Sequence, residues 1–405
     1  MAAPGARERT EVGIIGAGPA GLLLSHLLAQ AGISSVVLER STRHHIEERL
    51  RAGVVEHGIA NLLDAVGVGE RMRREGLVHR GIELRFSRRG HHVDFEALTG
   101  KTITVYGQQE LVKDLIARRL ADGGTLLFEA EAHEIAGIGS HQPTITYTHE
   151  GRDKTLSCSI VAGCDGFHGV SRAALPPGSY RAYETVHPFA WLGILAAVPP
   201  STDELIYANH ENGFALFSMR SPELSRCYLQ VAPNEVLDEW PDERIWAELR
   251  TRFATDDGFS IADGPILERS VTAMRSFVCD PMDFGALVLA GDAAHIVPPT
   301  GAKGMNLALA DVKDLAAALV ARLRERDDAP LKAYSPRAVA RAWQAQEFST
   351  FMTTLLHPRA GDDFANRLQI SRLEQIATSA AAARHLAERY VDLATTAGVA
   401  PEHAP

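Results

Sequence analysis

The chain has 405 residues and a formal net charge of −10. Its length predicts two or three domains with a large core, and its negative charge argues against a nucleic acid or an anionic membrane as a partner. The four cysteines have neither metal-ligand spacing nor the pattern of a disulfide framework, which is typical of the reducing cytoplasm. No stretch comes close to about 20 uninterrupted apolar residues, so we expect a soluble, cytoplasmic protein without a membrane span or a metal site.

The first predicted unit is a strand, a glycine-rich turn and a helix. The apolar run 11–15 leads into the sequence Gly-Ala-Gly-Pro-Ala-Gly at 16–21, and residues 22–31 have the apolar character of a buried helix. This order is that of a dinucleotide-binding turn, in which the free N–H groups at the start of the helix bind phosphates.

Each glycine of this turn has a separate physical reason. Gly16 permits the tight turn, Gly18 lets the backbone approach a pyrophosphate, and Gly21 lets the helix pack on the strand. A second apolar run, 35–38, ends in Glu39, which is placed to accept hydrogen bonds from ribose hydroxyls. A glycine-rich turn that binds nothing is the alternative, but strand, helix and acid are all in register, and this favours a nucleotide site.

Further along the chain, apolar spacing predicts alternating elements. Helices are expected at 55–66, 110–120 and 240–253, and strands at 125–128, 144–148, 156–162 and 286–290. From Phe189 to Val231, short β-like runs broken by Pro, Gly and Asn indicate a second domain. From about Gly304 onward almost everything is rich in Ala and Leu and is expected to be helical, whereas the ends, 1–10 and 401–405, look disordered.

Three segments that lie far apart each match one part of an FAD site. They are Gly16–Gly21, Cys164–Gly166 and Gly291–His295. Each one alone is weak, but together and in this order they predict an FAD-binding α/β domain.

Longer runs of sequence carry a family resemblance. They lie at 49–54, 104–108, 162–169, 205–210 and 290–306, the last of which reads AGDAAHIVPPTGAKGMN. Through these runs the chain resembles the group A flavoprotein aromatic monooxygenases over nearly its whole length. The resemblance implies a Rossmann-like FAD domain of the glutathione-reductase type, an inserted β-sheet substrate domain and a helical C-terminal region. Its expected segments are 1–182 and 271–322 for FAD, 183–270 for the substrate domain and 323–405 for the helices.

The resemblance also implies an activity. It is the hydroxylation of 4-hydroxybenzoate at the 3-position to 3,4-dihydroxybenzoate (protocatechuate), with NADPH or NADH and O₂, through a C4a-hydroperoxyflavin. A small aromatic acid and O₂ are then the expected partners, and a homodimer is the expected assembly. Alternative substrates are 3,4-dihydroxybenzoate and 4-aminobenzoate.

Two other functions fit the same scaffold less well. A halogenase would carry a Trp-x-Trp-x-Ile-Pro segment, which residues 191–194 do not supply. A non-catalytic prenyl-binding or escort protein on an FAD-like fold would need neither intact FAD motifs nor a polar substrate site.

The resemblance places FAD contacts at positions spread over the chain. They are Gly16, Gly18, Ala20, Gly21, Glu39, Arg49, Arg51, Gln108, Asp165, Asp292, Gly301, Met305 and Asn306. Asp292 matches the acid that binds the ribityl chain, and the turn 298–301 leads the chain past the isoalloxazine ring. A helix beginning near Gly304 would have free N–H groups that stabilise negative charge on the N1–C2=O edge of reduced flavin.

The nicotinamide cofactor needs a different kind of site, because the chain has only one Gly-x-Gly-x-x-Gly sequence. The resemblance implies transient binding of NAD(P)H on the surface of the FAD domain, with Arg40, His168 and Arg275 as the matching residues. The basic segment 40–45 leaves the choice between NADPH and NADH open.

A substrate site can be derived from the residues themselves. In the run 214–220 the side chains of Phe214, Leu216, Ser218 and Arg220 share one face of a strand. A hydroxyl and a guanidinium on an otherwise apolar face suit a carboxylate. An arginine in water at a sheet edge is the alternative; the resemblance assigns Ser218, Arg220 and Tyr228 to the substrate carboxylate.

The other end of the substrate requires a proton acceptor. Oxygen transfer is faster to a phenolate, yet a free phenol has a pKa of about 10. The resemblance assigns Tyr207 to the 4-hydroxyl, with Tyr390 behind it and His79 as the link to solvent. Pro299 is assigned to both the catalytic and the substrate-binding residues.

Overall fold

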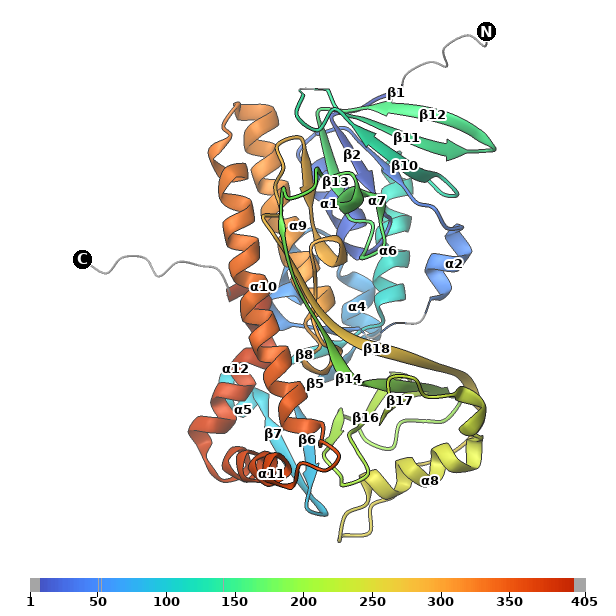
Figure 1. Ribbon diagram of the computed structural model, residues 1–405, viewed down its shortest axis with the longest axis vertical. Helices are drawn as coiled ribbons and strands as arrows, with labels where there is room; N and C mark the ends of the chain where they lie inside the picture. Colours follow the sequence, from blue (N-terminus) through green and yellow to red (C-terminus); the bar gives the residue numbers. More distant parts are fainter. Residues whose placement is uncertain (1–7, 50, 52, 141, 397–405) are drawn as a thin grey trace, which may run out of the picture.

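The computed structural model describes residues 8–49, 51, 53–140 and 142–396. Figure 1 shows an upper and a lower part, joined by two long strands and flanked by a long helix. The predicted disorder of the chain ends concerns residues that lie mostly outside this range. Residues 8–10 lie inside it. Glu8–Arg9 form β1, which pairs in parallel with β12 (Arg152–Ser157), and Thr10 is buried and donates to the carbonyl of Ser157, so the prediction is wrong for these three.

The upper part is built on a five-stranded parallel sheet. Across the sheet the strands are β19 (Leu287–Leu289), β13 (Ile160–Gly163), β2 (Val12–Ile15), β3 (Ser35–Leu38) and β9 (Thr125–Leu127). The first four are buried along their whole length, as expected for parallel strands covered on both faces.

Helices and a second sheet cover the two faces of this parallel sheet. The helices are α1 (Pro19–Gln30), α6 (Gln108–Ala121) and α9 (Gly304–Val320), with α1 packed against the other two. The second sheet has the order β1, β12, β11 (Thr144–His149), β10 (Glu131–Ala136). Gly13 of β2 leaves space for Ile145 of β11, so the two sheets pack closely.

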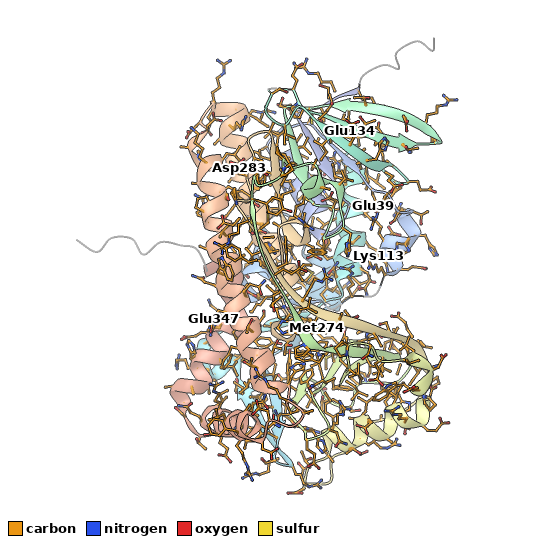
Figure 2. All side chains as sticks on the ribbon, in the orientation of Figure 1. Glu39, Lys113, Glu134, Met274, Asp283 and Glu347 are labelled. Atoms are coloured by element: carbon orange, nitrogen blue, oxygen red, sulfur yellow. The ribbon has the colours of Figure 1, made fainter. Side chains whose placement is uncertain are left out.

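The lower part contains an eight-stranded sheet. Its order is β20 (His295–Ile296), β18 (Ile266–Asp280), β14 (Arg181–Ala196), β17 (Leu224–Val231), β16 (Ala215–Ser221), β15 (Ile206–Ala208), β6 (Gly81–Phe86), β7 (Arg89–Asp94). Strands β14 and β18 run from the upper part into the lower one (Figure 1). Met274 of β18 is buried at this junction (Figure 2).

The remaining elements cover this sheet or connect the two parts. They are α2 (Arg43–Glu48), β4 (Val54–Val55), α3 (His57–Ala65), α4 (Glu70–Glu75), β5 (Leu77–His79), α5 (Phe95–Thr99), β8 (Ile103–Val105), α7 (Val170–Ala173), α8 (Asp242–Phe253), α10 (Ala329–Leu356), α11 (Asp363–Thr378) and α12 (Ala380–Thr396). Side chains of α8 pack on one face of the eight-stranded sheet, and side chains of α10, α11 and α12 pack on the other. Within the described residues, no helix combines the length and apolar character needed to cross a membrane.

Most predicted elements are confirmed within about two residues of their expected bounds, and the mixed α/β fold with a helical C-terminal region is confirmed. One further prediction is wrong. The run 156–162 is not one strand, because the chain turns at Cys158 and Ser159 and passes from β12 to β13 in another sheet. The β-like region 189–231 is made of short runs, although its first strand, β14, begins earlier at Arg181 and has 16 residues in all. Pro188 of β14 lies where the register with β18 shifts, a position at which a strand tolerates proline.

The eight-stranded sheet also crosses the expected domain boundaries. Strands β6 and β7 lie within the expected FAD segment 1–182 but pair in this sheet, β6 in parallel with β15. Strand β18 begins before residue 270 and continues to Asp280. The sequence could not indicate this, because the pairing joins segments about 120 residues apart.

A buried ionic network fastens α10 to the FAD domain. The carboxylate of Asp311 on α9 is fully buried and binds Arg341 of α10 at 3.0 Å, as well as His295. Arg341 also pairs with Asp314. Its guanidinium therefore compensates two acids of α9 inside the protein.

Removing Arg341 should therefore be costly. The variant Arg341→Met would leave the buried charge of Asp311 without its guanidinium, and breaking a buried pair in this way costs about 3–5 kcal/mol. The free energy of unfolding, from urea titration, should fall by that amount. Arg118→Met, which breaks an exposed pair with Asp122 on α6, should change it by less than about 0.5 kcal/mol. Equal losses in the two variants would contradict this interpretation.

Candidate active site

The glycine-rich turn has the close contacts that its sequence predicts. Gly16 has a φ of +103°, and a side chain there would collide with the carbonyl group of Cys164. A side chain at Gly21 would collide with the carbonyl oxygen of Gly16. At Gly18, by contrast, a Cβ would meet no atom within 4 Å. The turn is thus tight on its protein side and open at the start of α1, where Ala20 is buried in the first turn.

Glu39 closes the other side of this turn. Its buried carboxylate accepts hydrogen bonds from the backbone N–H groups of Ala17 at 2.9 Å and Ser41 at 2.8 Å. Figure 2 shows it in the upper part. Each oxygen has capacity for a further donor, so Glu39 can both hold the turn and accept from a ribose.

Basic side chains from the next segment gather nearby. Desolvation, followed by the positive charges of Arg51 and Arg40, lowers the pKa of Arg49, while the charges of Asp292 and Glu39 raise it. The predicted residues Arg40, Arg49 and Arg51 therefore lie close enough to repel one another. Such a cluster has a surplus of positive charge that suits phosphate groups.

The segment around Asp165 lies under the turn. One carboxylate oxygen accepts from the backbone N–H of Ser171 at 2.8 Å. The other is buried and has no hydrogen-bond partner among the described residues, and burial raises the pKa of Asp165. A buried acceptor without a partner fits a ligand that brings donors, as FAD does with its hydroxyl and N–H groups.

The side chain of Asn306 ties the first turn of α9 to the segment before α3. It accepts from the backbone N–H of Glu56 at 2.9 Å and donates to the carbonyl groups of Val54 and Ala302. No side chain caps the N–H groups at the start of α9 among the described residues. Gly301 is packed against Ser349 of α10, while Met305 is half-buried in the first turn of α9 and Gln108 is half-buried at the start of α6.

Lys303 is a residue that sequence reasoning missed. Its ammonium is buried and lies 2.8 Å from Glu56 Oε1 and 2.8 Å from the carbonyl oxygen of Tyr390. Burial lowers the pKa of Lys303 and the charge of Glu56 raises it. Its position in the run 290–306 was the signal that could have identified it.

The three residues predicted to bind a carboxylate lie together. Arg220 Nη1 donates to Ser218 Oγ at 2.7 Å and to the carbonyl of Met219 at 2.8 Å, and Nη2 donates to the hydroxyl of Tyr228 at 3.4 Å. Desolvation lowers the pKa of Arg220. No carboxylate of the described residues pairs with this guanidinium, which leaves it to bind an acid.

Tyr207 lies in the same row of side chains. It is paired across the sheet with Leu216, which is paired in turn with Tyr228, and residues opposite each other in this way face the same side. The hydroxyls of Tyr207 and Tyr390 are 2.5 Å apart. Both rings are buried, and burial raises the pKa of each phenol.

His79 is placed less favourably for its predicted role. It is fully buried, neither ring nitrogen has a hydrogen-bond partner among the described residues, and burial lowers its pKa to about 4. No hydrogen bond links it to Tyr390, so its role as a link to solvent stays a prediction. Pro299 is exposed at the start of the short 3₁₀ turn Pro299–Gly301.

Two of the three predicted nicotinamide residues meet around an aromatic ring. The guanidinium of Arg275 lies 4.5 Å from the ring centre of Phe167, and the ring of His168 lies 4.9 Å from it. Arg172 approaches the same ring at 4.6 Å. Arg40 instead belongs to the cluster around Arg49. Sequence reasoning missed Phe167 and Arg172, although Phe167 lies within the 162–169 run and Arg172 follows shortly after it.

Comparisons with known proteins identify the family and the fold. The family described as "FAD binding domain" matches residues 9–349. The p-hydroxybenzoate hydroxylase of Acinetobacter baylyi is 43% identical over 387 residues, which cover 95% of this chain and 96% of that protein. Among solved structures, p-nitrophenol 4-monooxygenase from Pseudomonas putida has a TM-score of 0.84 at 18% identity and covers 96% of this chain and 99% of its own. Anhydrotetracycline hydroxylase from Streptomyces rimosus has a TM-score of 0.74 at 23% identity and covers 95% and 76%. The two structures show the fold alone.

The buried histidines predict how stability depends on pH. Burial lowers the pKa of His79 to about 4, whereas an unfolded histidine has a pKa of about 6.5. Between these values the unfolded chain binds more protons than the folded one, so the free energy of unfolding falls as the pH drops from 6.5 to 4. His79 alone should contribute a loss of about 3 kcal/mol.

Urea titrations at several pH values measure this loss. His79→Asn, which keeps a polar side chain but does not titrate, should show a smaller decrease than the wild type. His133→Asn, at an exposed position on β10, is the control and should follow the wild type. An unchanged decrease in His79→Asn would show that this histidine is not the cause.

Proposed function

The chain belongs to the FAD-dependent aromatic hydroxylases, and on this premise we propose that it hydroxylates 4-hydroxybenzoate next to its hydroxyl group to form 3,4-dihydroxybenzoate. In the balanced reaction, NAD(P)H supplies a hydride and the medium a proton. One atom of O₂ enters the ring and the other leaves as water. The observation that carries the proposal is the row of polar groups on one sheet face, with a guanidinium clamp near one end and a tyrosine pair at the other.

The clamp selects an aromatic acid. Arg220 has no acidic partner among the described residues, and its neighbours Ser218 and Tyr228 supply two hydroxyls. A carboxylate there would gain charge-assisted hydrogen bonds to a fork of N–H groups. The apolar side chains on the same face, including Trp191 and Phe214, would contact the benzene ring and exclude water.

The tyrosine pair receives the substrate's hydroxyl. Tyr207 donates or accepts through a single hydroxyl, and its neighbour Tyr390 lies 2.5 Å away. Because burial raises the pKa of both phenols, each stays neutral. Tyr207 would accept the substrate's proton as it gives its own to Tyr390, and Tyr390 would give its own to solvent, with His79 as the predicted link. The pair would thus favour the phenolate form of the substrate, which reacts fastest with electrophilic oxygen.

FAD, when bound, supplies the hydride acceptor and the place where O₂ is activated. Gly18 and the start of α1, Glu39 and the arginine cluster would hold its nucleotide half, and Asp165 and Asp292 its ribityl part. The turn 298–301 and the backbone N–H groups that begin α9 would adjoin its ring, with Pro299 beside the substrate. The N–H groups contribute partial positive charge there.

NAD(P)H would approach at the aromatic cluster of Phe167, His168 and Arg275. Arg275 lies against the ring of Phe167 and makes a 3.4 Å ion pair with Glu184, in which both side chains are partly exposed. A pyrophosphate could therefore displace Glu184 at little cost. Relatives of the substrate, 3,4-dihydroxybenzoate and 4-aminobenzoate, have the same carboxylate and remain alternative substrates. A homodimer in the cytoplasm is the proposed form of the protein.

One assay tests the function as a whole. The purified protein should be yellow, and its oxidation of NAD(P)H should accelerate when 4-hydroxybenzoate is added, with 3,4-dihydroxybenzoate identified by chromatography. Turnover of 4-aminobenzoate or 3,4-dihydroxybenzoate without turnover of 4-hydroxybenzoate would show that one of these two compounds is the substrate instead. Absence of bound flavin would refute the proposal.

Arg220 should dominate substrate affinity. Loss of one partner of a buried charged pair costs about 2–5 kcal/mol, so Arg220→Ala should weaken binding of 4-hydroxybenzoate by at least tens-fold while the FAD content stays normal. Flavin absorbance titration measures the dissociation constant. Arg250→Ala removes an exposed arginine of α8 that pairs with Asp263 and should bind normally. An unchanged dissociation constant in Arg220→Ala would show that this residue does not bind the substrate.

Tyr207→Phe should separate proton transfer from binding. Without the hydroxyl the substrate stays protonated, so less product should form per NAD(P)H consumed and more hydrogen peroxide should be released, while substrate affinity changes little. Product and peroxide are measured together. Tyr147→Phe, which removes a hydroxyl bonded to Glu8 in the FAD domain, should stay fully coupled. Full coupling in Tyr207→Phe would contradict the assignment.

A further inference from the structure

Helix α10 presents a stripe of polar side chains to the site. Gln346, Ser349, Thr353 and His357 follow one another at spacings of three and four residues, which places them on one helical face. Gln346 donates to the carbonyl groups of Phe277 and Ile296, and Ser349 packs against Gly301. In Figure 1 the helix runs from the upper part to the lower one, so the stripe passes from the flavin turn to the substrate sheet.

Thr353 contacts the flavin turn and, through His357, the substrate sheet. Its hydroxyl lies 3.0 Å from the hydroxyl of Thr300, in the turn that follows Pro299. Its carbonyl oxygen lies 3.0 Å from Nδ1 of His357. Both threonines are almost fully buried, so neither contact competes with water.

His357 carries the connection into the substrate pocket. Its Nε2 accepts from the indole N–H of Trp191 at 2.8 Å, which leaves Nδ1 as the N–H that donates to Thr353. The ring stacks on Phe214 at 4.2 Å and on Phe189 at 4.4 Å. Burial lowers the pKa of His357 to about 3, so this pair of hydrogen bonds persists throughout the neutral range.

Trp191 completes the path at the carboxylate clamp. Its ring centre lies 4.9 Å from that of Tyr228, whose hydroxyl accepts from Arg220. A continuous series of contacts thus joins Arg220 to Thr300. It passes through Tyr228 and Trp191, which line the proposed substrate site, and then through His357 and Thr353. Packed and hydrogen-bonded chains of this kind transmit displacements because their members cannot move independently.

We propose that Thr353 and His357 are positioning residues that couple occupation of the carboxylate clamp to the turn 298–301. This inference rests on the proposed function, since it needs an acid in the clamp and FAD beside the turn. Binding of the acid draws Arg220 and Tyr228 onto its carboxylate, Trp191 follows Tyr228, and α10 passes the shift to Thr300 through His357 and Thr353. Neither positioning residue needs to touch the substrate.

Two measurements on the holoenzyme separate the ends of this path. Isothermal titration calorimetry gives the dissociation constant of 4-hydroxybenzoate at the clamp. The amplitude of the flavin absorbance difference at saturating 4-hydroxybenzoate reports on the flavin side. Circular dichroism and FAD content verify that each variant is folded and loaded.

Thr353→Val removes one hydroxyl with little change in shape. We expect a dissociation constant within about twofold of wild type but a flavin difference reduced by half or more. Thr353→Ser restores the hydroxyl and should restore the amplitude. Thr354→Val is the matched control, because Thr354 is the next residue of α10 and its hydroxyl bonds only to carbonyl groups of that helix; both of its values should equal those of wild type. If Thr353→Val folds poorly, Thr300→Val removes the same contact from the other side.

His357→Phe keeps the ring stack and removes both hydrogen bonds. The buried indole N–H of Trp191 then has no acceptor, so we expect weaker binding of 4-hydroxybenzoate by several-fold and the same loss of the flavin difference. The double variant Thr353→Val/His357→Phe should lose no more amplitude than the single variants, since residues on one path are not additive.

Wild-type amplitude in Thr353→Val or Thr300→Val, equal losses in Thr354→Val, or additive losses in the double variant would overturn the coupling alone. Failure of the wild-type holoenzyme to bind 4-hydroxybenzoate would overturn the proposed substrate and, with it, the coupling.

Discussion

The site depends on one buried ammonium group. Lys303, just before α9, binds Glu56 at the start of α3 and the carbonyl of Tyr390 on α12. Three segments separated by up to about 330 residues are thereby fixed to one point. Burying two charges carries a desolvation penalty that often cancels their attraction, so we do not read this pair as a source of stability. Its consequence is geometric: the tyrosine pair and the start of α9 share a common anchor.

Some features of the candidate site could be predicted from the sequence, and others could not. The glycine turn and Glu39 were predictable because their geometry is local: two glycines fit contacts that any side chain would block. The clamp was predictable because Ser218 and Arg220 alternate on one strand. The run 290–306 marked Lys303 as part of a matching motif, but its contacts with Glu56 and Tyr390 were not predictable, because both partners are distant in sequence. The same holds for the contact of His357 with Trp191. The family resemblance supplied Tyr207 and Tyr390, whose contact at 2.5 Å no spacing rule predicts.

Two further features of the structure could not be predicted for a similar physical reason. Strands β6 and β7 alternate in the usual way, but only tertiary packing determines that β6 pairs with β15 rather than with an element of the FAD domain. Asn306 was assigned to the cofactor because it lies in a matching run, whereas its amide bonds to Glu56, Val54 and Ala302. A residue can therefore belong to a functional motif by holding the backbone that does the binding.

The charges around the site affect the ionisation of the substrate in the proposed reaction. With an acid bound, Arg220 is paired with the substrate carboxylate and Lys303 with Glu56, so these four charges sum to zero. The phenolate form adds a negative charge that neither pair neutralises. Burial raises the pKa of Tyr207 and Tyr390, so they transfer the proton but do not compensate this charge. In the proposed reaction the tyrosine pair hydrogen-bonds to the substrate's hydroxyl, and the N-terminal N–H groups of α9 would add partial positive charge beside the flavin ring. Lys303 links these two groups, because it lies just before α9 and binds the carbonyl oxygen of Tyr390.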